Sequence, residues 1–200
     1  MEAIKLATVH DLLQRPEERV ELINGEIVHR TLPRPEHGWT QGTARSELDA
    51  FTRRSGPDGW WIITEASVAY EPHQCPTHDL AGWRRSRLPR LPEGPIELPP
   101  DWVCEIVSPG HERKDTRDIP LLLQRHGVPF YWLIWPEERR LVAHRRDGDT
   151  YQVVATLDHT QPARIPPFDE IVLDLGYILV GEPAVGEKGP GEKGPGSSGS

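Results

Sequence analysis

Short apolar runs separated by polar, proline-containing breaks dominate the chain, and most of these runs have the length of strands. Residues 102–107 form the run Trp-Val-Cys-Glu-Ile-Val, which predicts a core strand that carries one acidic residue. Residues 131–135 are apolar throughout, as expected of a central strand covered on both faces. Further strands are predicted at residues 61–64 and 68–70 and, as a hairpin across Asp147-Gly148-Asp149, at residues 141–144 and 151–156.

A second hairpin and several helices complete the pattern. Residues 20–28 predict the hairpin, because Asn24-Gly25 lies between apolar flanks and favours a type I′ turn. Residues 38–54 predict a helix in which apolar residues recur at helical spacing on one narrow face. Shorter helices are predicted at residues 8–13, with Thr8 as the cap, and at residues 115–126.

The mixture of strands and helices predicts an α/β fold, in which helices flank a mixed β-sheet. Residues 86–100 hold five prolines and therefore predict a surface loop. A chain of 200 residues suits one domain, which we place at residues 1–183. Residues 184–200 are rich in Gly, Pro and Ser and predict a flexible tail, because they offer almost no apolar surface to bury.

Two acidic residues at strand positions, Asp79 and Glu105, are the first candidates for chemistry. A carboxylate inside an apolar run is costly to bury unless it is paired or binds a cation. If the two converge on one face of the sheet, they make a site for Mg²⁺ or Mn²⁺, because Mg²⁺ takes one or two protein carboxylates plus waters and phosphate oxygens. The alternative is that both are structural acids, exposed or paired with arginine.

Composition narrows the partners and the compartment. The net charge of −8 opposes nonspecific coating of nucleic acid, although local basic patches remain. The largest such patch is Arg84, Arg85, Arg87 and Arg90, whose alternative is a solvated loop. Two cysteines make no disulfide framework, and no signal peptide or apolar run of membrane-spanning length is found. A cytoplasmic protein without a membrane span is expected.

Several motifs, taken in order, resemble a known family. They are Glu21 to Val28, His37 at the start of a helix, Asp79 to Arg85, Asp101 to Pro109, Gly127 to Pro129 and Tyr131 to Ile134. Together they resemble the Uma-two family, a bacterial group described as putative restriction endonucleases with the PD-(D/E)XK nuclease fold. The resemblance runs from about residue 8 to about residue 180 and lies in the order and spacing of the motifs rather than in any single one.

The resemblance implies a restriction-endonuclease-like fold and metal-dependent hydrolysis of DNA. It implies that Asp79 and Glu105 bind Mg²⁺ or Mn²⁺, with Glu65 as a third acid whose alternative is an exposed turn residue. His37 matches the family's histidine, which would contact phosphate or act as a base; its alternative is a structural hydrogen bond. DNA is the expected partner, and a homodimer is one expected form of assembly.

The sequence departs from the family at the catalytic lysine. In the strand that carries Glu105, alternation places the usual lysine at Val107. The family's relocated lysine, four residues after Asp115, falls at Ile119. Lys114 is the nearby lysine, but five residues of α-helix turn through about 140°, so Lys114 does not simply share the face of Ile119. Lys114 is therefore either a substitute for the missing lysine at the start of the helix or an ordinary surface lysine.

Three functions remain open from the sequence. The first is a Mg²⁺-dependent DNA endonuclease that uses Asp79, Glu105 and Lys114. The second is a binding or interaction module on a nuclease fold that has lost catalysis, which the missing lysines favour. The third is a nucleotide or RNA phosphodiesterase with the same metal pair, towards which the net acidity leans.

Overall fold

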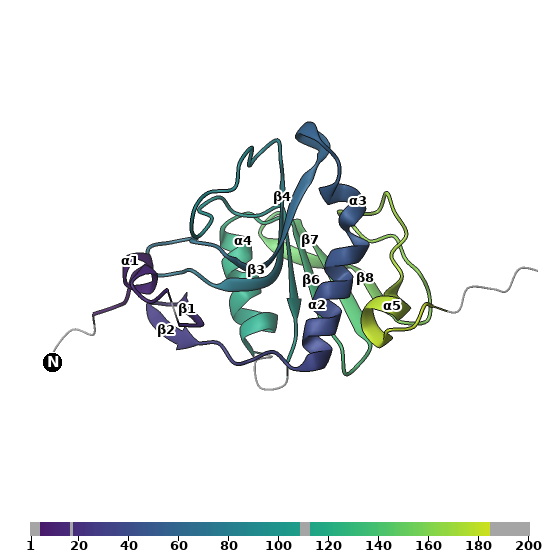
Figure 1. Cartoon of the computed structure of the whole chain (residues 1–200), viewed down its shortest axis with the longest axis horizontal. Coiled ribbons are helices and arrows are strands. Elements are labelled where there is room, and N and C mark those ends of the chain that lie inside the picture. Colours follow the sequence, from purple (N-terminus) through teal and green to yellow (C-terminus); the bar gives the residue numbers. More distant parts are fainter. Residues whose placement is uncertain (1–4, 17, 109–112, 185–200) are drawn as a thin grey trace, which may run out of the picture.

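The computed structural model describes residues 5–16, 18–108 and 113–184, which form one layered α/β fold (Figure 1). The expected tail lies outside the described residues except for its first position. The helices are α1 (Val9–Leu13), α2 (Pro35–Glu47), α3 (Asp49–Thr52), α4 (Ile119–Arg125) and α5 (Leu175–Val180), with a 3-10 turn η1 (Gly56–Asp58) and a π-helical turn η2 (Lys114–Asp118).

The strands form one six-stranded sheet and one separate hairpin. They are β1 (Val20–Ile23), β2 (Glu26–His29), β3 (Trp60–Ser67), β4 (Thr77–Arg84), β5 (Trp102–Ile106), β6 (Phe130–Trp135), β7 (Arg140–Asp147) and β8 (Thr150–Asp158). The large sheet has the order β3-β4-β5-β6-β7-β8. Strands β5 and β6 pair in parallel, and every other pair of neighbouring strands in this sheet is antiparallel. The predicted mixed sheet flanked by helices is confirmed.

The two faces of the sheet bury different apolar clusters. Alternate residues of β5 point to opposite faces: Trp102, Cys104 and Ile106 join the cluster beneath α2, α3 and α5. Val103 joins the cluster on the other face, which α4 covers (Figure 1). Glu105 shares the face of Val103, and it is therefore an acid on the side of the sheet that α4 and η2 approach.

An aromatic cluster makes the first face rigid. The ring of Phe168 lies 5.0 Å from both Trp60 and Trp102 and 5.7 Å from Trp132, measured between ring centroids. Buried aromatic pairs in tilted or edge-to-face arrangements add to the free energy gained from area burial. The strands that carry Asp79 and Glu105 therefore rest on a close-packed layer.

The β1–β2 hairpin is attached to the sheet through α1 and the segment before β4. Thr8 caps α1 with a reciprocal hydrogen-bond pair to Asp11, as the sequence predicts for the cap. Asn24 and Gly25 make the turn with positive φ values of 50° and 78°. Leu22 on the hairpin forms backbone hydrogen bonds with Cys75 in both directions, which fixes the hairpin beside the start of β4.

Some predicted elements differ from the observed ones. The helix expected at residues 38–54 begins earlier, at Pro35, because proline suits the first helical turn, and it is interrupted after Glu47. The strand expected at residues 68–70 is absent, since β3 continues to Ser67 and Val68 forms only an isolated bridge. Helix α5 was not predicted, although Asp174 caps it and Gly181 ends it with a positive φ.

Candidate active site

A polar cavity of about 420 Å³ opens where β4 and β5 meet the β1–β2 hairpin and η2. Its walls bring together acidic and basic side chains from segments far apart in the sequence. The acids are Glu21, Glu65, Asp79, Glu105, Asp115 and Asp118, and the lysine and arginine side chains are Arg19, Arg30, Arg34 and Lys114. Such a mixture of acidic and basic side chains in a concave site is typical of binding or catalysis rather than of packing.

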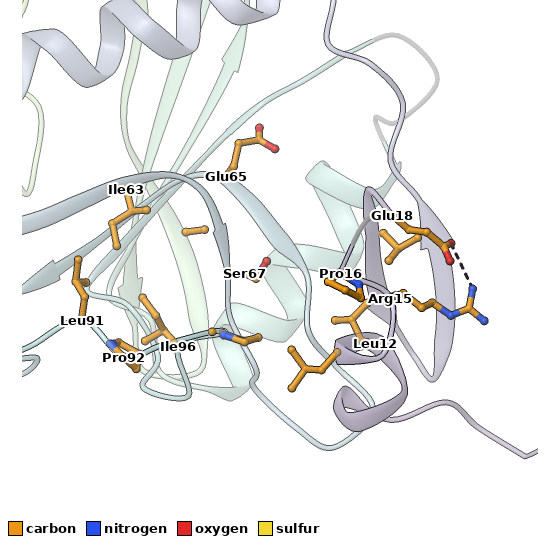
Figure 2. Close-up of a pocket in the computed structure, with 15 residues that line it drawn as sticks. Leu12, Arg15, Pro16, Glu18, Ile63, Glu65, Ser67, Leu91, Pro92 and Ile96 are labelled. Carbon is orange, nitrogen blue, oxygen red and sulfur yellow. Dashed lines mark hydrogen bonds and ion pairs between the residues drawn. The ribbon is translucent and has the colours of Figure 1, made fainter.

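A second cavity, also of about 420 Å³, lies on the other side of Glu65, between α1 and the proline-rich loop (Figure 2). Its lining is mainly apolar and includes Leu12, Ile63, Leu91 and Ile96. In Figure 2 the Glu65 carboxylate points away from these apolar side chains. The second cavity gathers no comparable set of acids and bases, and the polar cavity is therefore the candidate active site.

Asp79 and Glu105 lie side by side on neighbouring strands, as the sequence predicts. The pairing of Leu80 with Cys104 places them in adjacent positions of antiparallel β4 and β5. The backbone N–H of Ile106 donates to Asp79 Oδ2 at 2.8 Å, and that of Asp79 donates to Glu105 Oε2 at 3.3 Å. Each carboxylate is thus held by a backbone amide of the other strand, and both line the same cavity.

His78 holds the other oxygen of Glu105. Its Nδ1 lies 2.5 Å from Glu105 Oε1, and its Nε2 lies 2.9 Å from the Tyr70 hydroxyl. Burial, with the charge of Lys114, lowers the pKa of His78 to about 3, and burial raises the pKa of Tyr70. The ring is therefore neutral, and Tyr70 keeps its proton. The tautomer that satisfies both contacts has Nδ1–H donating to Glu105 and Nε2 accepting from Tyr70.

The ionised form of Glu105 is electrostatically disfavoured in this site. Its carboxyl group is almost fully buried, and burial together with the negative charge of Asp79 raises its pKa well above the usual range. Asp115 behaves similarly: burial and then the charge of Glu105 raise its pKa to about 9. A divalent cation bound between such buried carboxylates would offset their mutual repulsion.

Lys114 points into this cavity and not towards bulk solvent. Its Nζ donates to both carboxylate oxygens of Glu21, at 2.7 and 2.8 Å. Burial opposes its charge, but the charges of Glu21 and Glu105 outweigh burial and raise the pKa of Lys114. Glu21 also accepts from the backbone N–H of Thr77 at 3.1 Å. Lys114 is thus a charged ammonium in the cavity that Asp79 and Glu105 also line, and an acid of the first hairpin holds it.

The π-helical turn changes the expected geometry of Lys114. The N–H of Ile119 donates to the carbonyl of Lys114, a bond that spans five residues instead of four. In such a turn, residues five apart lie nearly above one another, as residues four apart do in an α-helix. The angle of 140° expected for an α-helix is therefore wrong here. Lys114 stands one turn from Ile119 on a similar side, and Ile119 itself is buried in the cluster beneath α4.

His37 lies in the first turn of α2 and bridges two strand ends. Its Nε2 lies 3.2 Å from Asp79 Oδ1, and its Nδ1 lies 3.1 Å from the Ser108 hydroxyl. Burial opposes protonation, but the hydrogen bond to Asp79 and the charges of Asp79, Glu65 and Glu105 raise the pKa of His37. This environment favours the imidazolium, which suits a contact to phosphate better than the role of a base.

Glu65 lies in β3 beside Asp79 but has a left-handed backbone, with φ of 52°. The β3–β4 ladder is regular on both sides of Glu65 and is interrupted at this residue. Gln41 of α2 bridges the interruption, since its amide donates to the Asp79 carbonyl at 2.8 Å and to Glu65 Oε1 at 3.1 Å. Arg30 and Arg19 contact the other carboxylate oxygen of Glu65. Glu65 is thus an acid paired with arginine, and its side chain is 36% exposed, so that the exposure expected by the alternative is retained.

The geometry fits a divalent cation held by two carboxylates and water. Across the described residues, 5–16, 18–108 and 113–184, no three His, Cys, Asp or Glu side chains stand close enough to hold a metal ion. Mg²⁺ does not need three, because one or two carboxylates with waters and phosphate oxygens complete its octahedron. The hard oxygen donors of Asp79 and Glu105, with their unfavourable mutual charge, suit Mg²⁺ or Mn²⁺.

The predicted arginine patch divides into structural contacts. The guanidinium of Arg84 lies over the ring of Trp60 at 4.7 Å, and that of Arg85 over Trp61 at 4.1 Å. Arg87 pairs with Asp101 at 2.8 Å. These contacts tie three of the four arginines to neighbouring side chains of the protein and do not favour a free basic patch. The arginines of the cavity come instead from the residues that flank the first hairpin: Arg19 directly before β1, and Arg30 and Arg34 after β2.

Sequence reasoning gave little weight to Glu21 and overlooked Arg30, His78 and Gln41. The available signal for His78 was its place directly before Asp79 in the sequence. The signal for Arg30 was its position directly after the second strand of the hairpin. Neither signal specifies a partner, because the partners lie 27 and 35 residues away.

A comparison with family models decides the relationship. Residues 6–176 match the Uma-two model, whose description is "Putative restriction endonuclease". The chain belongs to the Uma-two family. Among solved structures, it is similar to one described as a putative nuclease belonging to DUF820 from Anabaena variabilis ATCC 29413, with a TM-score of 0.69 and 23% identity over 86% of this chain and 97% of that one. No curated protein matches the chain.

The Uma-two relationship supports a nuclease-like function, and the solved structure independently supports the fold. The acids and Lys114 all fall within the matched range. Within the described part of the chain, no helix is long and apolar enough to cross a membrane.

Proposed function

We propose that the protein is a divalent-metal-dependent endonuclease that hydrolyses phosphodiester bonds of DNA. The observation that carries the proposal is the convergence of two buried carboxylates, Asp79 and Glu105, with the charged Lys114 in one cavity. Metal-dependent hydrolysis of a phosphodiester needs oxygen ligands for the ion and a fixed positive charge near the reacting phosphate. Membership of the Uma-two family supports the same reaction class.

Each side chain has a defined role in this proposal. Asp79 and Glu105 hold the ion, which when bound polarises the phosphate and activates a water. Backbone amides and His78 keep both carboxylates oriented, so that little reorganisation is needed. Lys114 stabilises the extra negative charge of the transition state. His37, as an imidazolium, contacts a phosphate oxygen, and Glu65 is the proposed third acid near the ion.

A catalytically degenerate nuclease fold is the second candidate function. The observation that favours it is the apolar side chain at both usual lysine positions: Val107 and Ile119 are buried in the cluster beneath α4. On this alternative the pairing of Lys114 with Glu21 is purely structural, and the cavity binds DNA or a protein partner without cleavage.

Metal titration by calorimetry, combined with nicking of supercoiled plasmid, tests the proposal. Wild type is expected to bind Mg²⁺ and Mn²⁺ and to nick the plasmid, whereas Asp79→Asn and Glu105→Gln lose at least tenfold in metal affinity and lose cleavage, because each removes a charged ligand. Asp118→Asn removes the same charge from the same cavity without removing a proposed ligand, and it serves as the control.

Two outcomes contradict the proposal in different ways. Absence of metal binding in wild type removes the metal site itself. Metal binding without cleavage of plasmid, linear duplex or single-stranded DNA favours the degenerate alternative.

A further inference from the structure

Arg30 occupies an unusual position in the polar cavity. Its guanidinium pairs with Glu65 Oε2, and its Nη2 lies 3.9 Å from Asp79 Oδ1. The side chain is 16% exposed, so that it lies inside the cavity rather than at its rim. A protein cation therefore stands between two acids that are both candidates for the metal site.

The bonding of Arg30 is weaker towards Asp79 than towards Glu65. The 3.9 Å contact is long for a charge-assisted hydrogen bond, which favours about 2.7–2.9 Å. Glu65 keeps two other partners if Arg30 leaves, because Arg19 lies 3.4 Å from the same oxygen and Gln41 lies 3.1 Å from the other. Release of Arg30 therefore leaves neither acid without a hydrogen-bonded neighbour, since Asp79 retains Ile106 and His37.

We propose that Arg30 is an exchangeable counter-ion: it neutralises Glu65 and Asp79 before metal binds, and in the metal-bound state it turns to a phosphate of the nucleic acid. The inference rests on the proposed function, since it takes Asp79 and Glu105 as the metal pair. Asp79 Oδ1 already has His37 Nε2 at 3.2 Å and Arg30 Nη2 at 3.9 Å, and a divalent ion at Asp79 adds further positive charge beside them. The resulting repulsion weakens the longer of the two contacts first, which is that of the guanidinium. A guanidinium released inside a cavity is well suited to bind phosphate through two parallel hydrogen bonds.

The exchange predicts that loss of Arg30 has opposite effects on the affinity for metal and on the affinity for DNA. Arg30→Met removes the competing cation while keeping an unbranched side chain, and it should bind Ca²⁺ or Mg²⁺ about tenfold more tightly in calorimetry, since one positive charge near the ion is lost. The same variant should bind duplex DNA about tenfold more weakly in Ca²⁺, with a smaller dependence on salt. In EDTA, where Arg30 pairs with Glu65 and does not contact phosphate, the loss of DNA affinity should be clearly smaller than in Ca²⁺, because only the overall charge of the cavity changes.

Arg34→Met is the matched control. Arg34 lines the same cavity, but its guanidinium pairs with Glu137 at 3.0 Å and contacts neither proposed ligand. It should leave metal affinity unchanged. Arg30→Lys keeps the charge without the planar fork and should show near-normal metal affinity with weakened DNA binding. Circular dichroism and the intact length of the duplex after titration verify the fold and the absence of cleavage.

The outcomes separate this inference from the proposed function. If wild type binds metal through Asp79 and Glu105 but Arg30→Met binds it no more tightly, only the exchange is refuted. A loss of DNA binding of equal size in EDTA and in Ca²⁺ also refutes the exchange, because Arg30 would then contact phosphate regardless of metal. If wild type binds no metal, both the proposed function and the exchange are refuted.

Discussion

Removing Lys114 tests whether its ammonium serves catalysis or only pairs with Glu21. Lys114→Met keeps the aliphatic stem and removes the charge. Because neither Val107 nor Ile119 supplies a cation, the loss should reduce cleavage about 10²-fold or more, which corresponds to about 3 kcal/mol of transition-state stabilisation. Metal affinity should not fall, since lysine is not a proposed ligand.

The same substitution also has a cost in stability that the structure allows us to estimate. Glu21 is 4% exposed, and without Lys114 it still accepts a hydrogen bond from the Thr77 backbone N–H. Breaking a buried ion pair by removing one partner costs roughly 3–5 kcal/mol. The Lys114 side chain is 23% exposed, so we expect a cost below that range, about 2–3 kcal/mol, because the pair is partly solvated.

A second substitution separates the two effects. Glu21→Gln combined with Lys114→Met removes the stranded charge and should restore most of the lost free energy of unfolding, measured by urea denaturation. Plasmid nicking by the double variant should stay about as low as in Lys114→Met. If the double variant regains cleavage, or if Lys114→Met alone cleaves like wild type, Lys114 is a structural partner of Glu21 and the catalytic assignment is refuted.

Two further predictions concern stability. In EDTA, Asp115→Asn should raise the free energy of unfolding at pH 7 by no more than about 4 kcal/mol and have no effect near pH 4. The pKa of Asp115 is about 9 in the folded state and about 3.8 in the unfolded state, so the wild-type protein loses stability as pH rises between these values, and Asn removes that loss. An equal gain at both pH values would contradict this. Gly82→Val should lower the free energy of unfolding by roughly 1–3 kcal/mol in thermal or urea melts, because a Cβ at Gly82 would already stand 3.2 Å from both Trp102 and Trp60; wild-type stability would show that these rings move aside.

Local sequence signals determined much of the fold and the heart of the candidate site. The Asn24-Gly25 turn, the Thr8 cap and the alternation of β5 depend on neighbouring residues, and all three are observed. Alternation on β5 placed Glu105 on the face of Val103, because side-chain direction in a strand follows from position. The expectation that Asp79 converges with it rested on the resemblance to the Uma-two family as well as on the two apolar segments.

Only the tertiary structure determined which charged side chains form ion pairs with one another. Lys114 reaches Glu21 across 93 residues, and Arg30 reaches Glu65 across 35. The π turn at Lys114 and the left-handed backbone at Glu65 are departures from regular geometry that no local pattern announces. At each of these positions the side chain has partners from other segments: Glu21 of the hairpin for Lys114, and Gln41 of α2 with Arg30 for Glu65. Such pairings arise from strand register and helix placement, which are collective properties of the packed fold.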